Sequence, residues 1–350
     1  MVIHYKKESV RHPAGRFFVT GALAVLLLMG CRQAGPVQLV GEAQGTYYSV
    51  QYFDAQQRNL QPQIDSLLDD FDLTASLWVD SSLLRRVNAN LTTEVSSRFA
   101  DLLQKSLEMN RYSEGAFDCR IGRIVQVWGF SFKERSEPDS AMLDSLLRAA
   151  RGKVSVGSDG HTLVKEHAAT ELDFNAIAQG YASDLLAHYL DSLGIHNYLI
   201  DIGGEVIARG EKPGGKPWTV GIERPAEERY SAPEVQAAIA LRDASVVTSG
   251  NYRKYYEKDG VRYSHTIDPA TGRPVKHSLL SVSVIEKECW LADAMATAYM
   301  VMGLERAKQF IASHPGGPGT RAVFFIYDEG GHMKEYATPD FEKMIIKQNQ

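Results

Sequence analysis

Residues 171–205 have the sequence ELDFNAIAQGYASDLLAHYLDSLGIHNYLIDIGGE and predict a loop, a helix and a strand in succession. Asp173 stands between apolar residues, and small residues fill the loop after it. Apolar residues then recur at helical spacing up to Gly194, which is placed to end the helix. Residues 198–202 indicate a buried strand, and Gly203-Gly204 a tight turn. Because the first amides of a helix have no partner within it, this order predicts an anion site at the helix N-terminus.

The segments on either side of this unit alternate between helical and strand patterns. We expect helices at residues 60–77, 80–88, 97–113, 138–151, 290–302 and 307–313. We expect strands at 39–52, 205–209, 218–223, 235–241, 245–252, 281–286 and 322–327, a strand that ends in a turn at 263–274, a hairpin at 154–164, and a polar C-terminal end. Residues 39–345 therefore predict a single compact α+β domain, with a central, largely antiparallel sheet flanked by helices.

The composition excludes some classes of partner. The chain has 350 residues, of which 44% are hydrophobic and 23% charged, enough for a sizeable core in one large domain or two ordinary ones. The net charge is -5, and no run rich in Lys and Arg occurs beyond the N-terminal region. We therefore expect no nucleic acid as a partner.

Residues 1–30 indicate an export signal rather than part of the fold. Basic residues precede the apolar run at 17–29, which is too short for a comfortable membrane span. The run ends in Leu28-Met29-Gly30-Cys31, which resembles a bacterial lipobox. Lipidation of Cys31 would anchor the protein in the cell envelope, facing the periplasm or the exterior, with residues 31–38 as a tether. The alternative is an ordinary secretory signal that contains a cysteine.

Two further cysteines, Cys119 and Cys289, lie far apart in the sequence. An exported protein can form a disulfide, but two buried thiols that act as small apolar side chains are the more common arrangement.

Three positions could carry chemistry. Asp293 and Thr297 are spaced i and i+4, so their oxygens emerge on one helix face, and the loop at Asn175-Ala176 could add a backbone carbonyl. Such oxygen ligands suit Mg²⁺ beside substrate phosphates, although this spacing alone is common in helices that bind nothing. His265, on a strand before Asp268, is a candidate general base or phosphate contact; a lone strand histidine is more often structural.

Several short motifs occur together in one order, and through them the chain resembles the FAD:protein FMN transferase (ApbE) family over about residues 40–330. In this sequence the motifs are Gly45-Thr46, Ser82-x5-Asn88, Gly115-Ala116-Phe117-Asp118 with Trp128-Gly129-Phe130, Asp173-x6-Gly180-Tyr181-Ala182 with Gly203-Gly204, Thr248-Ser249-Gly250, His265-x-Ile267-Asp268-Pro269-x-Thr271-Gly272-Arg273-Pro274, and Ala292-Asp293-x3-Thr297-Ala298.

The resemblance implies a Mg²⁺-dependent enzyme that cleaves FAD, its substrate, moves FMN onto a Ser or Thr hydroxyl of an exported or membrane-bound redox subunit, and releases AMP. The implied metal ligands are the carbonyl of Ala176 and the side chains of Asp293 and Thr297, and His265 is our candidate base. The implied flavin contacts are Gln44, Trp78, Ala116, Phe117, Asp118, Asp173, Gln179 and Ile267.

The sequence departs from the family pattern near the expected phosphates. Gln179 stands where Lys is frequent, so one positive charge is missing, and Arg120 is a candidate to replace it. Gln44 stands at a usual Met, Asn175 at a usual Gly, and Trp78 at a common Tyr, where it would still stack on a flavin ring. Alternative functions are an FAD pyrophosphatase that yields FMN and AMP, a flavin-binding lipoprotein without turnover, and an inert structural lipoprotein.

Overall fold

The computed structural model describes residues 35–130, 138–225, 234–251, 255–258 and 261–346, with side chains left aside at 255–258 and 261–264. The predicted signal and Cys31 lie outside these residues. Residues Pro36–Gln350 form one compact unit by their contacts, and everything below concerns that unit.

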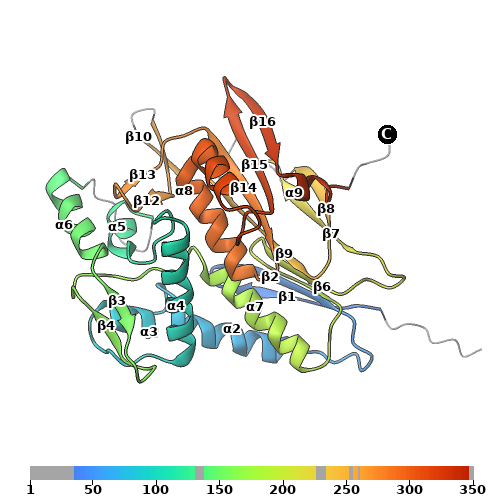
Figure 1. Ribbon diagram of the computed structural model, residues 1–350. Helices are drawn as coiled ribbons and strands as arrows, with labels where there is room; N and C mark the ends of the chain where they lie inside the picture. The colour runs from blue at the N-terminus through green and yellow to red at the C-terminus, as the bar shows by residue number, and fades with distance from the viewer. Residues whose placement is uncertain (1–34, 131–137, 226–233, 252–254, 259–260, 347–350) are drawn as a thin grey trace, which may run out of the picture. The chain divides into compact units, whose positions relative to one another are not determined.

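An eight-stranded sheet with antiparallel pairing throughout organises the fold (Figure 1). Its strands run in the order β1-β2-β5-β6-β9-β14-β15-β16. They are β1 (Val37–Ala43), β2 (Thr46–Tyr52), β5 (Tyr198–Ile202), β6 (Glu205–Arg209), β9 (Ala244–Gly250), β14 (Leu279–Glu286), β15 (Ala322–Glu329) and β16 (His332–Ala337). The predicted α+β class and the antiparallel central sheet are confirmed.

Alternating burial explains the register at the centre of the sheet. In β2, Tyr48, Val50 and Tyr52 are fully buried, and β5 pairs with it so that Ile202 lies opposite Tyr48 and Ile200 opposite Val50. These residues therefore bury one face of both strands against the same core. Each buried aliphatic side chain contributes about 1.5–3 kcal/mol to folding, and a slip by one residue would expose the whole set.

The two faces of the sheet are covered differently. Three helices, α2 (Gln61–Ala75), α7 (Ala178–Ser192) and α8 (Cys289–Ser313), pack on one face and enclose the main core. On the other side, the hairpin β7 (Trp218–Glu223) and β8 (Val235–Leu241) joins α9 (Pro339–Glu342) around buried residues that include Trp218 and Phe341. α7 and α8 lie side by side, and the candidate site is built on them.

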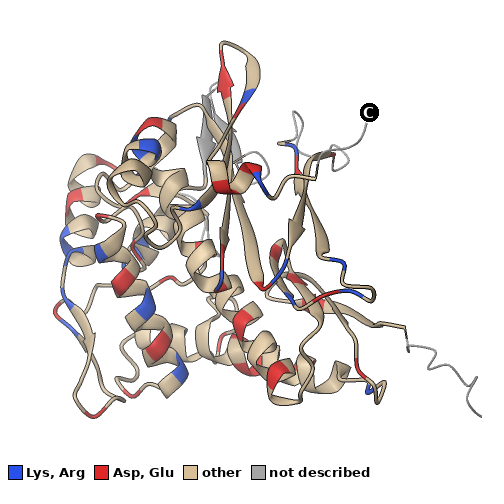
Figure 2. Ribbon diagram, turned by 45° about the vertical axis from the view of Figure 1, so that its right-hand side comes forward, with Lys and Arg blue, Asp and Glu red and all other residues tan. Residues whose placement is uncertain are grey.

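A second group of short elements lies beside the helical face (Figure 1). It consists of α3 (Leu83–Asn88), α4 (Ser97–Tyr112), α5 (Gly122–Val127), α6 (Ser140–Ala150) and the hairpin β3 (Val154–Val156) with β4 (Leu163–Lys165). Two further hairpins are β10 (Tyr255–Lys258) with β11 (Val261–Ser264), and β12 (Ile267–Asp268) with β13 (Arg273–Pro274). Acidic and basic positions are interspersed along the helices of this group (Figure 2).

Two expectations need correction. Residues 39–52 form the hairpin β1–β2 rather than one strand, because Gln44 (φ 53°) and Gly45 (φ 72°) turn the chain in a left-handed conformation. The polar C-terminus contains β16 and α9, with β16 at the sheet edge, where polar side chains are common. The two separate helices expected at 290–302 and 307–313 are confirmed, since Gly303, with a φ of 72°, interrupts α8. The turn expected at the end of residues 263–274 is present between β12 and β13.

Cys119 and Cys289 are both buried and free, which confirms the prediction of two buried thiols. Burial raises the pKa of both. No helix in the described part of the chain is long and apolar enough to cross a membrane.

Candidate active site

Gly180 in the first turn of α7 sets how closely α7 and α8 approach. A Cβ atom at this position would come 2.6 Å from the carbonyl oxygen of Cys289 and 2.8 Å from Cβ of Asp293. Both distances are shorter than van der Waals contact, so a larger residue would separate the two helices. The predicted loop of small residues therefore serves helix packing at Gly180.

Asp293, a predicted metal ligand, lies at this contact. Its Oδ2 accepts a hydrogen bond of 3.0 Å from the Gly180 amide, and only 5% of the residue is exposed. Burial, opposed by this bond and reinforced by the nearby Asp184 carboxylate, raises the pKa of Asp293 to about 7. Its Oδ1 makes no hydrogen bond within the described residues. Thr297 is half-buried one turn further along α8.

The loop before α7 is fixed from two sides. Asn88 at the end of α3 bonds both backbone groups of Leu172, each at 2.8 Å. Asp173 next to it donates its amide to the carbonyl of Cys119 at 2.7 Å, and its Oδ1 accepts from the amide of Asn175 at 2.8 Å. Burial raises the pKa of Asp173 to about 6. Ala176 follows Asn175 and is half-buried. Its carbonyl therefore lies in the turn that these hydrogen bonds fix.

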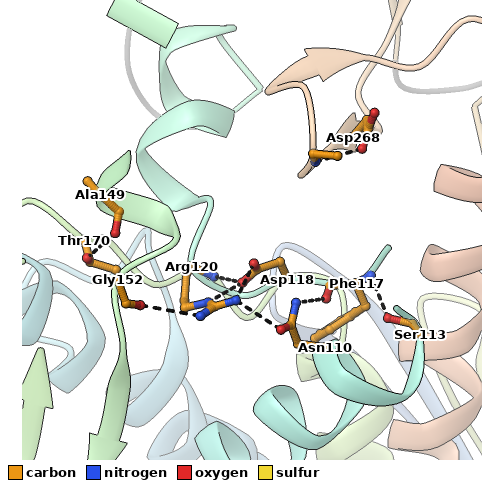
Figure 3. Close-up of polar contacts among 10 residues, drawn as sticks. Asn110, Ser113, Phe117, Asp118, Arg120, Ala149, Gly152, Thr170 and Asp268 are labelled. Carbon is orange, nitrogen blue, oxygen red and sulfur yellow. Dashed lines mark hydrogen bonds and ion pairs between the residues drawn. The ribbon is translucent and has the colours of Figure 1, made fainter. Parts of the chain in front are cut away.

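Residues 115–120 run beside this loop and are held by α4. Phe117 is buried, its amide donates to Oγ of Ser113 at 2.9 Å, and its carbonyl accepts from Nδ2 of Asn110 at 2.8 Å (Figure 3). Ala116 is buried beside it. Asp118 forms a two-point ion pair with Arg120, with Nε–Oδ1 at 2.9 Å and Nη2–Oδ2 at 2.8 Å. Such forked pairs are the strongest arrangement for this pair of groups.

The guanidinium of Arg120 makes several hydrogen bonds within this network. Besides Asp118, its guanidinium donates to Oδ1 of Asn110 at 3.0 Å and to the carbonyl of Gly152 at 3.4 Å (Figure 3). Hydrogen bonding to Asp118 raises the pKa of Arg120. The expectation that Arg120 replaces the missing lysine charge is therefore not supported, because its charge is matched by Asp118.

Gln44 lies in the turn between β1 and β2, and the side chain of Gln179 lies near the turn between β5 and β6 at Gly203-Gly204. Nε2 of Gln179 lies 3.2 Å from the position of a Cβ on Gly203 (φ 64°), which also faces Thr46. The amide of Gln44 is buried, and among the described residues neither its Nε2 nor its Oε1 has a hydrogen-bond partner. A buried group without partners is rare in folded proteins, and a bound ligand is one explanation.

Trp78 lies in the connection between α2 and α3 and is 57% exposed. Its amide donates to Oγ of Ser76 at 3.1 Å. Ser82 fixes the same connection, since its Oγ donates to the carbonyl of Ser76 at 2.6 Å and accepts from the amide of Arg85, which caps α3. The ring of Trp78 is thus presented to solvent by an ordered turn, as stacking on a flat ligand requires.

His265 and Ile267 lie beside α5. The half-buried His265 ring meets Phe130 edge to face, with centroids 6.4 Å apart. Ile267 is buried against a cluster that includes Trp128, whose Nε1 donates to the carbonyl of Gly272 at 2.7 Å. The side chain of Ile267 therefore serves packing in the described structure.

The turn after Ile267 is closed by Asp268. Its carboxylate accepts from the amide of Ala270 at 2.9 Å and from Oγ1 of Thr271 at 3.0 Å. A cleft of about 610 Å³ borders the turn and is lined by Trp128, Pro138, Asp268, Thr271, Arg273, Pro274, Val275, Lys276, His277 and Val301. None of the predicted metal ligands lines this cleft.

The described residues hold no cluster of three or more His, Cys, Asp or Glu side chains that could bind a metal ion. A metal here would depend on one carboxylate, one hydroxyl and one carbonyl. Mg²⁺ is commonly held by one or two carboxylates together with water and substrate phosphates. The unpaired Oδ1 of buried Asp293, with Thr297 one turn away, fits that pattern.

Sequence reasoning missed two contributors. Asp184 of α7 accepts from the amides of Cys289 and Trp290 in the first turn of α8, and Asn110 supports both Phe117 and Arg120. Asp184 lies four residues after Gly180, which was the only available signal, and its partners lie 105 and 106 residues later.

Comparison with known proteins gives one consistent result. The sequence model of the ApbE family matches residues 44–323. A Vibrio cholerae protein named FAD:protein FMN transferase is 36% identical over 343 residues, covering 95% of this chain and 100% of the relative. A protein of the same name from Escherichia coli K12 is 33% identical, with coverage of 93% and 96%.

Solved structures agree. The flavin transferase ApbE from Vibrio cholerae superposes with a TM-score of 0.76 at 33% identity and covers 89% of this chain and 99% of its own. The apo form of the Pseudomonas stutzeri flavinyl transferase ApbE gives a TM-score of 0.78 at 31% identity, with coverage of 90% and 98%.

Proposed function

The chain belongs to the ApbE family, and from that premise we propose that it transfers FMN from FAD to a hydroxyl of a protein, with Mg²⁺, and releases AMP. Its relatives' shared name, FAD:protein FMN transferase, supports the transfer. Mg²⁺ and the Ser or Thr acceptor are the finer parts of the proposal and rest on the site itself.

The proposal of a metal ion rests on the environment of the Asp293 carboxylate. One carboxylate oxygen is bound to the Gly180 amide, and the other has no hydrogen-bond partner within the described residues. A buried carboxylate without a cation is costly, which is why the pKa of Asp293 is raised. A divalent cation held with Thr297 and the carbonyl of Ala176 would compensate this charge. When bound, Mg²⁺ would neutralise the pyrophosphate of FAD and polarise the P–O bond that breaks.

The residues of the chain would orient FAD around this point. In the first turn of α7 the amides of Ala178 and Gly180 already donate to the carbonyl of Phe174 and to Asp293, so the amide of Gln179 is the one that would donate to an anion at this helix N-terminus. Trp78 offers an exposed ring for stacking, and the buried amide of Gln44 offers a donor and an acceptor. Ala116, Phe117, Asp118, Asp173, Gln179 and Ile267 complete the proposed set.

His265 is proposed as the general base. It would take the proton of the acceptor hydroxyl as the oxygen of that group bonds to the phosphorus of the FMN part. The bond between this phosphorus and the bridging oxygen then breaks, and AMP leaves with that oxygen. FAD and the acceptor thus become AMP and a protein with FMN attached through a phosphoester.

The cell envelope is the proposed location. Lipidation at Cys31 would hold the enzyme at a bacterial membrane by its acyl chains, facing the periplasm or the exterior. The acceptor would be an exported or membrane-bound subunit of a redox complex, which carries the flavin that it receives.

The deciding experiment incubates the soluble Cys31→Ser variant with FAD and Mg²⁺, with and without a candidate acceptor domain. AMP release and the mass of the acceptor are measured, with Asp293→Ala as the matched control. An acceptor that gains one FMN, but not with Asp293→Ala, supports both transfer and the metal site. AMP and free FMN without a modified acceptor would indicate an FAD pyrophosphatase. FAD that stays bound and intact would indicate a binding protein and overturn the proposal.

A further inference from the structure

The helices α7 and α8 exchange their N-terminal caps. The residues at the N-cap positions, Ile177 of α7 and Glu288 of α8, make no side-chain hydrogen bond to the backbone amides of their own first turns, and Oε2 of Glu288 accepts from Nε1 of Trp290 at 2.5 Å instead. Asp293 of α8 accepts from the Gly180 amide of α7 at 3.0 Å. In return, Asp184 of α7 accepts from the amides of Cys289 and Trp290 of α8, at 3.0 and 2.8 Å. Each helix thus supplies the carboxylate that the other lacks.

The exchange fixes α8 at two points one turn apart. Asp184 holds the amides at the start of α8, and the Gly180 contact holds the same helix at Asp293. Because Gly180 has no side chain, the backbone of α7 packs directly against α8 between these two points. α8 therefore cannot rotate or slide against α7 without breaking a buried hydrogen bond, and the face that carries Asp293 and Thr297 keeps one orientation.

We propose that Asp184 is a positioning residue for the transfer reaction, which holds the first turn of α8 so that Asp293 and Thr297 face the metal. The inference rests on the proposed metal-dependent function. Asp184 is 8% exposed, and both of its oxygens are bonded to α8 backbone, so it acts through α8 rather than on the substrate. Loss of groups that orient metal ligands commonly weakens metal affinity by about 10–100-fold.

A simpler role as a helix cap must be separated from positioning. Glu288→Asp gives α8 a cap of its own, because Asp is among the best N-cap residues. The variants are therefore Asp184→Ala, Asp184→Ala with Glu288→Asp, and Glu288→Asp alone. Asp191→Ala, at an exposed position near the end of α7, is the matched control. If Asp184→Ala does not fold, Asp184→Asn replaces it, since its amide keeps one acceptor oxygen.

Three quantities are measured for each full-length variant carrying Cys31→Ser. They are the melting temperature, the Mg²⁺ concentration for half-maximal AMP release, and the gain in FAD affinity on adding Mg²⁺, from the quenching of FAD fluorescence. We expect Asp184→Ala to need about tenfold more Mg²⁺ and to lose most of the Mg²⁺-dependent gain in FAD affinity. In the double variant, the melting temperature should recover while the Mg²⁺ requirement stays high.

Two outcomes would overturn the inference alone, given a normal response to Mg²⁺ in the parent protein. One is an unchanged Mg²⁺ requirement in the Asp184 variants. The other is a requirement that recovers together with the melting temperature, which would make Asp184 only a cap. A parent protein that does not respond to Mg²⁺ would overturn the proposed function and this inference with it.

Discussion

Asn88 holds Leu172 by two hydrogen bonds of 2.8 Å, one to each backbone group, and so fixes the residue directly before Asp173. The two residues come from different elements 84 positions apart. The side-chain amide of Asn88 thus bonds the backbone N–H and C=O of Leu172 in the way that a neighbouring strand would. This contact explains why an asparagine at the end of α3 belongs to the same motif set as the proposed FAD contacts.

Asn88→Ala should destabilise the protein and weaken FAD binding together. It leaves both backbone groups of Leu172 unpaired, which costs about 1–3 kcal/mol for each group if it stays buried. We expect a lower urea midpoint and an FAD dissociation constant raised about tenfold or more. Gln104→Ala on the exposed side of α4 is the control and should change neither value. An intact FAD affinity in Asn88→Ala would show that the loop at Asp173 does not contact the ligand.

Gln44→Met should stabilise the FAD-free protein and weaken its binding of FAD. The buried amide of Gln44 has no hydrogen-bond partner in the described part of the chain, so its replacement by an apolar group of similar size should raise the free energy of unfolding by about 1 kcal/mol without FAD. If the amide binds FAD, the same change should weaken FAD binding, measured by calorimetry. Lower stability together with unchanged FAD affinity would contradict both expectations.

The stability of the metal-free protein should depend on Asp293 in a defined direction. Its folded pKa of about 7 lies above the usual value of 3.8, so the folded state binds a proton more tightly than the unfolded state between these values. Stability due to this group is therefore present below pH 4 and lost as the pH rises to 7. The lost amount is on the order of 1.4 kcal/mol for each pKa unit.

Urea unfolding of wild type and Asp293→Asn at pH 5 and pH 8, with EDTA, tests this expectation. Asp293→Asn should gain stability relative to wild type at pH 8 and much less at pH 5. FAD with Mg²⁺ should stabilise only the wild type at pH 8. The same difference between the two proteins at both pH values would exclude a raised pKa at Asp293.

The Asp118–Arg120 pair should show strong non-additivity. Both side chains are largely buried, with 10% and 16% exposed, so Asp118→Ala leaves the guanidinium without its carboxylate. We expect a loss of about 3–5 kcal/mol in unfolding free energy for the single variant, and a smaller loss for Asp118→Ala with Arg120→Met. Equal losses in both proteins would mean that solvent compensates Arg120, and that its charge is available to a ligand after all.

The sequence was most informative where local pattern and function coincide. The loop, helix and strand of residues 171–205 follow their predicted order, because α7 has helical spacing and β5 alternates between buried and half-buried positions. The hairpin at Gln44-Gly45 was missed, because a glutamine at positive φ is uncommon and gives no turn signal. β16 was missed because an edge strand with a largely exposed side lacks an apolar pattern.

The candidate site residues come from motifs in the sequence, whereas their hydrogen-bond partners are visible only in the folded chain. Gly180 and Asp293 stand in separate motifs. Only the folded chain shows that Asp293 packs where a side chain at position 180 would lie, and that it accepts a hydrogen bond from the Gly180 amide. The pairing of Arg120 with Asp118 two residues earlier was visible as opposite charges, yet the sequence could not show that Asn110 and Gly152 complete its hydrogen bonds.

The exchange of caps between α7 and α8 also determines when the protein can become active. The Gly180–Asp293 bond joins residues 113 positions apart, and the Asp184 bonds join residues 105 and 106 apart. Contacts of such separation form late, because a long loop must close before they stabilise anything. A chain that emerges from its N-terminus must therefore deliver residues up to Thr297 before it can form the proposed metal site, so under that proposal a partly synthesised or partly exported chain would not consume FAD.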